Sequence, residues 1–187
     1  MVHSDQEREG LKWQTGVWNR ISDIYVREID RRFVPVVEAL ITRAVLTPGE
    51  HVLDLGTGTG AVAQRAAALV SPGGQVTGVD INPEMLAVAQ QRKEAIGLSN
   101  VRLLEGRAEN IPADDNTFDV VLACLSLMYV IDRSSSAARE IARVLRPGGR
   151  LVAAAWGAPE QCDIVLFQQT AGSFAGLHPC QAWVRER

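Results

Sequence analysis

Three glycines and two carboxylates are the residues of this 187-residue chain whose types and spacing could do chemistry. Gly56, Gly58 and Gly60 follow an apolar run that contains Asp54, and Asp80 ends the next apolar run. Glycine lets a ligand approach bare backbone, and a following helix offers unpaired N–H groups at its start. A carboxylate after the second strand can accept both ribose hydroxyls of a nucleoside. The pattern therefore predicts a site for a nucleoside cofactor.

The spacing of these glycines discriminates between cofactors. A dinucleotide fingerprint is G-x-G-x-x-G, whereas this chain has G-x-G-x-G and carries Ala61 where the third glycine of that fingerprint would fall. The acid-x-G-x-G-x-G pattern that begins at Asp54 resembles motif I of the class I S-adenosylmethionine-dependent methyltransferases. The alternative is a turn whose glycines are purely structural. The run Asp80-Ile81-Asn82-Pro83 after the next apolar segment makes that alternative the less favoured one.

Composition and charge exclude several classes of protein. Hydrophobic residues make up 47% of the chain and charged residues 22%, which is typical of a globular domain. A net charge of -3 argues against nucleic acid as a general partner, because nucleic-acid binding needs a basic footprint. No apolar run reaches the ~18 residues of a membrane-spanning helix, and the charged start of the chain is unlike a signal peptide. We expect a cytoplasmic protein without an integral membrane segment.

The cysteines and histidines predict neither a disulfide framework nor a metal site. The cysteines are odd in number, widely spaced and without a C-x-x-C pair, and the histidines show no ligand spacing. Cys124 lies inside an apolar run, where we expect it to pack as a small hydrophobe. The residues concerned are Cys124, Cys162, Cys180, His3, His51 and His178.

Four segments can be distinguished along the chain. Residues 1–10 are polar and are predicted to be flexible. Residues 11–46 carry apolar residues at helical intervals and predict one or two helices as an N-terminal cap, with Pro35 as the point where they kink or separate. Residues 47–157 are predicted to form the cofactor-binding core, and residues 158–187 form a C-terminal segment.

The core segment alternates between strand-like and helix-like runs. This alternation predicts a mostly parallel, doubly wound α/β sheet with right-handed crossovers. Ligands of such a sheet bind beyond the carboxyl ends of the strands, which is where Gly56, Asp80 and Ser126 fall. The expected strands are Val52–Leu55, Gln75–Asp80, Val101–Leu104, Phe118–Leu125 and Arg150–Trp156, and the expected helices are Ala61–Val70, Pro83–Ile96 and Ser136–Leu145.

Three further motifs narrow the resemblance. Leu103–Pro112 resembles the adenine loop after the third strand, Phe118–Cys124 resembles motif II, and Ala142–Leu151 resembles the helix end that turns into the fifth strand. With motif I, they make about residues 13–157 similar to the ubiquinone/menaquinone-biosynthesis type of small-molecule methyltransferase. The resemblance implies a Rossmann-like methyltransferase fold, S-adenosylmethionine as cofactor and a small-molecule methyl acceptor.

The resemblance also implies roles for individual residues. The carbonyl groups of Gly56 and Cys124 would accept from the amino group of the methionine moiety, and Asp80 would hold the ribose hydroxyls. Relatives often close the site with an aromatic residue of the N-terminal helix, which Trp18 or Tyr25 would match; packing within a helix face is the equally open alternative for Tyr25. The implied cofactor-binding set is Asp54, Gly56, Thr57, Gly58, Gly60, Asp80, Ile81, Ala108, Glu109, Cys124 and Leu125, and the catalytic candidate is Tyr25, with Tyr129 and His178 also near the methyl group.

Two departures from the family pattern stand out. Many relatives place an acid at the position of Arg107 to bind the adenine amino group. Arginine cannot accept a hydrogen bond, so this role passes to Glu109 or is lost, and a solvated surface arginine is equally open. The family fold usually closes with two more strands, which the residues after Trp156 are not expected to supply, so the chain looks truncated relative to the family. The fifth strand would then be an exposed edge that a homodimer could cover.

These observations leave three hypotheses for function. The leading one is an S-adenosylmethionine-dependent methyltransferase that acts on a small, apolar or amphipathic acceptor by in-line methyl transfer. The second is a remnant that binds S-adenosylmethionine or S-adenosylhomocysteine with little turnover, because the C-terminal acceptor wall is missing. The third is a nicotinamide oxidoreductase, which ranks last because the third glycine is misplaced.

Overall fold

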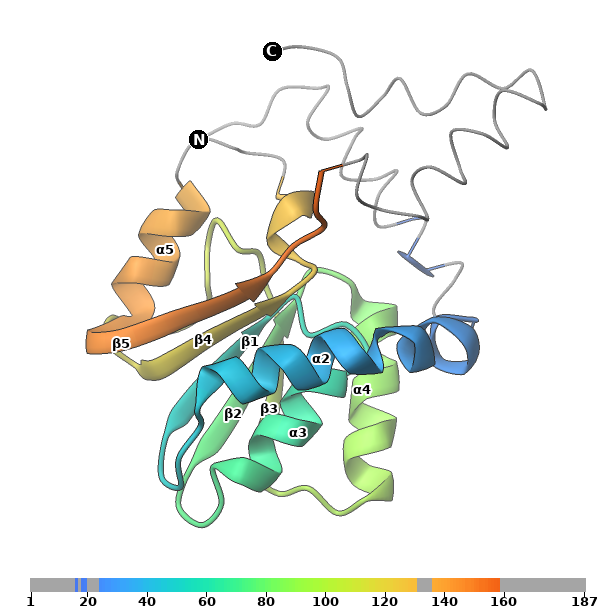
Figure 1. Cartoon of the computed structure of the whole chain (residues 1–187), viewed down its shortest axis with the longest axis horizontal. Helices are drawn as coiled ribbons and strands as arrows, with labels where there is room; N and C mark the ends of the chain where they lie inside the picture. The colour runs from blue at the N-terminus through green and yellow to red at the C-terminus, as the bar shows by residue number, and fades with distance from the viewer. Residues whose placement is uncertain (1–15, 17, 20–23, 131–135, 159–187) are drawn as a thin grey trace. The chain divides into compact units, whose positions relative to one another are not determined.

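The computed structural model describes residues 16, 18–19, 24–130 and 136–158 of the chain (Figure 1). Its centre is a five-stranded sheet in the order β3-β2-β1-β4-β5, and every neighbouring pair is parallel. The strand order reverses beside β1, because the chain runs outward through β2 and β3 and then returns to β4. This sheet confirms the doubly wound fold predicted from the sequence. The strands are β1 (His51–Leu55), β2 (Gln75–Asp80), β3 (Val101–Glu105), β4 (Phe118–Cys124) and β5 (Leu145–Ala154).

Helices cover both faces of this sheet. Figure 1 shows α2 and α3 together on one face, and α5 beside β5. Two short segments, η1 and η2, lie near the carboxyl ends of the strands. The helical segments are η1 (a π-helix, Tyr25–Ile29), α2 (Asp30–Ala44), α3 (Ala61–Leu69), α4 (Pro83–Ala95), η2 (a 3₁₀-helix, Leu127–Tyr129) and α5 (Ser136–Val144). No helix in the described ranges is both long and apolar enough to span a membrane.

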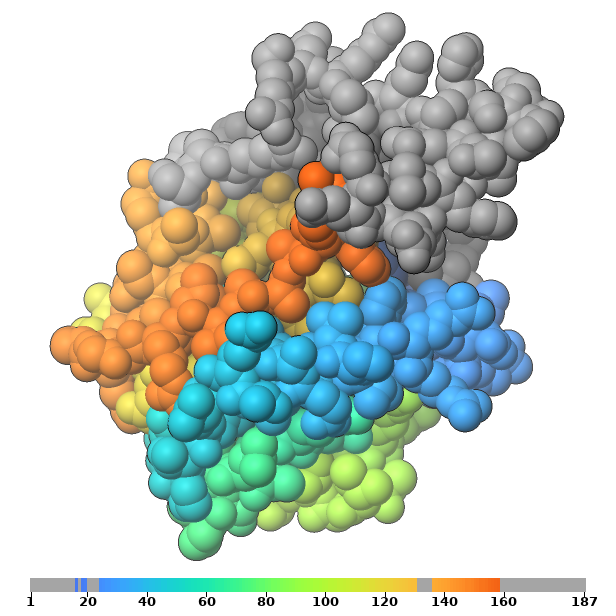
Figure 2. All heavy atoms as spheres, in the orientation of Figure 1, coloured from blue at the N-terminus to red at the C-terminus, as the bar shows by residue number. Residues whose placement is uncertain are grey.

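Side chains that alternate along each strand contribute to two separate apolar cores. Val52 and Val120 pack in the core under α2 and α3, whereas Leu53 and Val121 pack in the core under α5. Because both faces of the central strands are covered, these strands are continuous apolar runs, which is why the sequence predicts them well. In Figure 2 the atoms of α2 and α3 form one continuous surface over their face of the sheet.

The fifth strand differs from the sequence prediction of Arg150–Trp156. It begins at Leu145, which pairs with Phe118, and it ends at Ala154. Between this first pair and the next, Val120 with Arg150, the register shifts, so the proline–glycine–glycine turn forms a bulge within the strand. The predicted turn is therefore real, but the chain pairs with β4 on both sides of it. Helix α5 accordingly ends at Val144, one residue earlier than predicted.

Residues 25–44 of the segment expected to be helical form η1 and α2. Segment η1 continues into α2, and the Asp30 N–H donates to the Tyr25 carbonyl five residues back. Pro35 lies inside α2 and does not separate two helices. Residues 1–10 and 159–187, for which flexibility and a C-terminal segment are predicted, lie outside the described residues.

The predicted start of α4 is confirmed, and the helix ends at Ala95, one residue earlier than predicted. The side chain of Asn82 caps the helix by accepting from the Met85 N–H at 3.0 Å, and Pro83 occupies the first turn. Gly97 follows the helix with a φ of +67°, the left-handed conformation in which glycine commonly ends helices. This cap fixes the start of α4 directly after Asp80.

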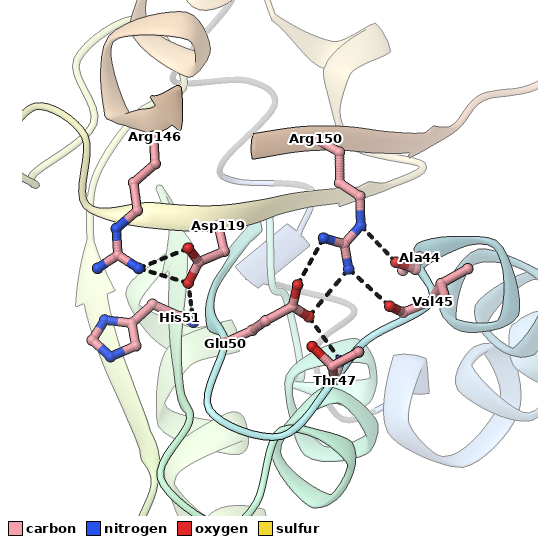
Figure 3. Close-up of polar contacts among 8 residues, drawn as sticks. All are labelled: Ala44, Val45, Thr47, Glu50, His51, Asp119, Arg146 and Arg150. Carbon is pink, nitrogen blue, oxygen red and sulfur yellow. Dashed lines mark hydrogen bonds and ion pairs between the residues drawn. The ribbon is translucent and has the colours of Figure 1, made fainter. Parts of the chain in front are cut away.

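At the amino ends of the strands, ion pairs tie the sheet to the helix before it (Figure 3). Arg150 binds Glu50 at 2.7 Å and donates to the carbonyl of Ala44, the last residue of α2. Asp119 accepts both from Arg146 at 2.7 Å and from the backbone N–H of His51 at 2.8 Å. These contacts fix the entry of β1 against β4 and β5.

Candidate active site

A pocket opens at the carboxyl ends of β1, β2 and β4, beside the reversal in strand order. This is the position expected for a ligand of an open α/β sheet. The predicted site residues that line it are Tyr25, Gly56, Gly58, Asp80, Ile81, Ala108, Glu109, Cys124 and Leu125. Asp54, Thr57 and Gly60 are not among the lining residues. Thr57 donates a hydrogen bond to Asp54, and Gly60 ends the glycine turn before α3.

The first glycine of the turn is required by packing. Gly56 has a φ of +78°, and a Cβ added there would lie 2.3 Å from the Cβ of Ser126. Ser126 is held in this place because its hydroxyl donates to the Leu55 carbonyl at 2.6 Å. The Gly56 N–H in turn donates to the Val79 carbonyl at 2.8 Å, which ties the turn to β2. No other residue type fits at position 56 without displacing β4's end.

The second glycine faces the pocket. Gly58 has a φ of +53°, and a Cβ added there would meet no atom within 4 Å. Its N–H donates to Oδ2 of Asp80 at 2.8 Å, so the turn and the carboxylate after β2 are directly linked. A ligand in the pocket can therefore approach the bare backbone of Gly58 and the Asp80 carboxylate together.

Asp80 is held in a fixed orientation. Besides Gly58, the Asn82 N–H donates to its Oδ1 at 2.9 Å. Burial raises the pKa of Asp80 above its ordinary value, although backbone N–H groups of Asn82, Gly58 and Ile81 oppose this shift. Each carboxylate oxygen has a second lone pair, so the group remains able to accept from a ligand hydroxyl.

Asp54 lies beneath the turn and is 1% exposed. Its Oδ2 accepts from the Thr57 hydroxyl at 2.6 Å, whereas Oδ1 makes no hydrogen bond with the described residues. Burial raises the pKa of this carboxyl from 3.8 to about 7, against the hydrogen bond from Thr57 and a weaker effect of the Ala63 N–H. Burial therefore favours the protonated form of a carboxyl group that does not itself line the pocket.

A polar network that the sequence did not predict joins the turn to two helices. The Thr59 hydroxyl donates to both oxygens of Asp30, at 3.1 and 2.9 Å, and Arg92 binds the same carboxylate. Arg92 also donates to the Thr59 carbonyl at 3.3 Å. Asp30 begins α2 directly after η1, so this network fixes the segment that carries Tyr25 to the glycine turn. Gly60 closes the turn, where a Cβ would lie 3.2 Å from Ala89.

Arg107 and Glu109 form an ion pair at 3.2 Å. Both residues line the pocket, and their side chains are 24% and 14% exposed. The interpretation of Arg107 as a solvated surface arginine is therefore wrong. The arginine holds the carboxylate of Glu109, which lines the same pocket as Ala108 and Ile81 and has further lone pairs for a ligand.

Three aromatic rings also line the pocket. Trp18 packs edge-on against Tyr25 and Tyr129, with ring centroids 5.8 and 5.6 Å apart. Burial, and then the charge of Asp30, raise the pKa of Tyr25 above its ordinary value, so this phenol stays neutral and is no general base at neutral pH. Next to Trp18, the side-chain oxygen of Asn19 accepts a hydrogen bond from the side-chain amide of Asn82 at 2.7 Å.

The end of β4 completes the site. Cys124 packs against the apolar core, as expected, and also lines the pocket. Burial, and then Asp54, raise the pKa of its thiol to about 11. Leu125 has a φ of +53°, a strained conformation of the kind that clusters at functional sites. His178 lies outside the described residues.

Sequence reasoning missed several lining residues that flank the motifs. Asn82, the cap of α4, and Met85, within α4, both line the pocket, and Met85 is 4% exposed. The sequence signal that could have identified these two residues is their position shortly after Asp80. The remaining lining residues are Leu55, Val79, Gly106, Ser126, Leu127 and Val130.

Comparison with known proteins agrees with this geometry. Residues 53–153, more than half of the chain, match the methyltransferase domain family. The chain is 34% identical over 145 residues to "Ubiquinone/menaquinone biosynthesis C-methyltransferase UbiE" of Shewanella sediminis (strain HAW-EB3). This alignment covers 77% of the chain and 55% of the relative, so the chain spans about half the length of this curated relative.

Two solved structures are similar in fold. A SAM dependent methyltransferase from Aquifex aeolicus superposes with a TM-score of 0.61 at 26% identity, over 73% of this chain and 78% of that one. The [4+2]-cyclase SpnF superposes with a TM-score of 0.58 at 35% identity, over 66% and 44%. The chain belongs to the class I S-adenosylmethionine-dependent methyltransferase family, as its motifs predict. Since one similar structure is named as a cyclase, the fold alone does not determine the reaction.

Proposed function

We propose that this chain transfers a methyl group from S-adenosylmethionine to a small, apolar or amphipathic molecule. The observation that carries the proposal is the pocket in which the bare backbone of Gly58 and the fixed Asp80 carboxylate meet. The open space beside Gly58 is the kind of cradle that a nucleoside cofactor needs. The family to which the chain belongs supports the same assignment.

The pocket offers groups for each part of this cofactor. Asp80 would accept from the ribose hydroxyls, and Ile81 would pack on the adenine. Glu109, held by Arg107, would accept from the adenine amino group in place of the acid that is absent at position 107. The backbone carbonyls of Gly56 and Cys124 would accept from the amino group of the methionine moiety. Asp54, Thr57 and Gly60 would act on the cofactor only through the shape of the turn.

The chemistry follows from the groups around the pocket. When bound, the cofactor supplies an activated methyl group on a positively charged sulfur, which an acceptor attacks in line with the departing sulfur. The chain's part is to hold the acceptor and exclude water. The ordinary pKa values of the Tyr25 phenol and the Cys124 thiol already leave both groups neutral at pH 7, and burial raises both pKa values further. Tyr25 would therefore act by contact and by donating a hydrogen bond, and not by removing a proton.

Two measurements test this proposal. Calorimetry with S-adenosylhomocysteine and with NAD should show binding of the former only, since the glycine spacing disfavours a dinucleotide. Transfer of a labelled methyl group to a panel of small quinols, phenols and amines should then show turnover. If S-adenosylhomocysteine binds but no acceptor is methylated, the hypothesis of a cofactor-binding remnant is favoured. The similarity to a protein named as a methyltransferase does not support that hypothesis. Binding of NAD alone would overturn the assignment.

Partners and location remain predictions from the sequence. We expect a small-molecule acceptor, no nucleic acid, and a cytoplasmic location. β5 lies at one edge of the described sheet, and a homodimer through this edge is the expected assembly. Light scattering over a range of concentrations tests it, and a constant monomer mass would contradict it.

A further inference from the structure

The polar network at the glycine turn joins elements that are far apart in the sequence. Asp30 is the first residue of α2, Thr59 lies in the glycine turn, and Arg92 belongs to α4. Thr59 is 2% exposed, and the side chains of Asp30 and Arg92 are 13% and 28% exposed. Salt screens a partly buried ion pair much less than an exposed one. The network can therefore hold the three elements together at physiological ionic strength.

Asp30 connects this network to Tyr25 through its backbone. The Asp30 N–H donates to the Tyr25 carbonyl five residues back, which is the hydrogen bond of a π-turn. Single π-turns are rare and frequently occur at functional sites. The carboxylate of Asp30 meanwhile accepts from Thr59 and from Arg92. One residue thus binds η1 through its backbone, and the glycine turn and α4 through its side chain.

Apolar packing does not fix η1 in the way that it fixes the rest of the helix. None of the residues of η1 is buried, and the buried residues of α2 begin only at Val37, two turns beyond Asp30. Tyr25 nevertheless lines the pocket, together with Gly58 of the glycine turn and Met85 of α4. The Asp30 carboxylate binds η1 to the two elements that carry these other lining residues.

We propose that Asp30 is a positioning residue of the cofactor pocket, whose carboxylate fixes η1 so that Tyr25 stays in the pocket wall. This inference rests on the proposed function, because it takes the pocket as the place of the cofactor. Asp30 is not among the lining residues, so its effect on a ligand passes through a residue that is. A wall that is already in place costs less ordering when a ligand binds, which raises affinity.

Substitutions in the network should weaken the binding of S-adenosylhomocysteine. Asp30→Asn keeps the shape of the side chain but removes the charge that Arg92 binds, and calorimetry should show about three- to ten-fold weaker binding. Thr59→Val removes the hydroxyl and should act in the same direction, whereas Thr59→Ser keeps it and should bind as the wild type does. The matched control is Glu38→Gln, which removes the charged partner of Arg65 in an ion pair between α2 and α3 and should leave the affinity unchanged.

A double-mutant cycle distinguishes positioning from a general loss of structure. Tyr25→Leu removes the side chain through which Asp30 acts, and should itself weaken binding. In that background, Asp30→Asn should change the affinity less than about 1.5-fold. Effects that multiply would show that Asp30 acts on the glycine turn or on overall stability, and wild-type affinity in Tyr25→Leu would show that Tyr25 does not contact the ligand. Either result would overturn the inference. Thermal unfolding establishes that each variant is folded at the temperature of the binding experiment.

Hydrogen exchange tests the positioning without any ligand. The amides of residues 25–30 should exchange at least about three-fold faster in Asp30→Asn than in the wild type, while those of residues 37–44 stay unchanged. Glu38→Gln should leave the exchange of residues 25–30 as it is. Unchanged exchange of these amides in Asp30→Asn would overturn the inference even if the cofactor binds. If the wild type does not bind S-adenosylhomocysteine, the proposed function fails, and the exchange rates still decide whether Asp30 holds η1.

Discussion

At the two ends of the same parallel sheet, the pKa values of the carboxyl groups are shifted in opposite directions. At the amino ends, burial alone would raise the pKa of Asp119, but hydrogen bonds from the His51 N–H and Arg146 lower it overall (Figure 3). The pKa of Glu50 is likewise lowered, chiefly by Arg150. At the carboxyl ends, burial raises the pKa of Asp54 and of Asp80, and no arginine pairs with either in the described residues.

This difference distinguishes acids that stabilise the fold from acids that are available to a ligand. Each acid at the amino ends has an arginine within 2.7 Å, so its charge is already neutralised and its role is to hold strands and helix together. Asp80 at the carboxyl end is held by backbone N–H groups alone and keeps lone pairs for a ligand. Desolvated acids in a pocket are candidates for function, whereas acids with lowered pKa values in ion pairs are commonly structural.

The largest expected effect is on cofactor binding, and it distinguishes Gly58 from Gly148, which lie at opposite ends of the sheet. Gly58→Val should abolish S-adenosylhomocysteine binding, raising the dissociation constant by more than about a hundred-fold, because a branched side chain would fill the open cradle. Gly148→Val, in the bulge of β5, has the same positive φ problem and the same empty surroundings, but no ligand role. Both variants should lose about 1–2 kcal/mol of stability to backbone strain. Calorimetry and thermal unfolding check this pair. Wild-type affinity in Gly58→Val would show that the turn does not face the cofactor.

The next comparison uses two aspartates. Asp80→Ala should weaken cofactor binding about ten- to a hundred-fold, equivalent to about 1.5–3 kcal/mol, because a charged acceptor of the ribose hydroxyls is lost. Asp119→Ala should leave binding unchanged and reduce the free energy of unfolding by about 1–2 kcal/mol, since it frees Arg146 and the His51 N–H. Equal cofactor affinities in the two variants would remove Asp80 from the site.

The two ends should also respond to pH in opposite directions. The folded pKa of Asp54 is raised from 3.8 to about 7, so the folded state binds the extra proton and stability falls as the pH rises from about 4 to about 7. The folded pKa of Asp119 is lowered, so its contribution is present above its unfolded pKa and is lost as the pH falls below it. Thermal unfolding against pH measures both: Asp54→Asn should flatten the curve between pH 4 and 7, and Asp119→Ala should flatten it below pH 4. A wild-type slope in Asp54→Asn would place the titration elsewhere.

The sequence predicted the sheet well because its strands are buried on both faces. Such strands are mainly apolar. β1 leads into Gly56, β2 ends at Asp80, and β4 is uncharged from Val120 to Cys124. The start of β5 was missed because the proline and glycines after Arg146 are typical of a turn, and nothing local shows that Leu145 already pairs with Phe118. Local sequence shows where a turn lies but not whether a neighbouring strand pairs across it.

The parts of the site that could not be predicted depend on contacts between distant residues. Thr59 looks like a spacer between glycines, and Asp30 and Arg92 look like charges on solvated helix faces, but folding brings them into one network. Their separations of 29 and 62 residues leave no periodic signal. Motifs predicted the glycine turn and Asp80 because their chemistry is local to one strand–turn–helix unit.

The smallest expected effect on cofactor affinity comes from a comparison of two ion pairs. Glu109 is held by Arg107 inside the pocket, whereas Glu50 is held by Arg150 at the amino ends. Glu109→Gln keeps the shape of the side chain but replaces a charged acceptor by a neutral one, so S-adenosylhomocysteine should bind about two- to ten-fold more weakly. Glu50→Gln is the matched control and should leave this affinity unchanged while lowering the melting temperature, because Arg150 loses its charged partner. Inosine-containing S-inosylhomocysteine lacks the adenine amino group, so the Glu109→Gln variant should lose its disadvantage with this ligand. If Glu109→Gln weakens both ligands equally, Glu109 does not accept from the adenine, and the ion pair in the pocket is as structural as the one at the other end of the sheet.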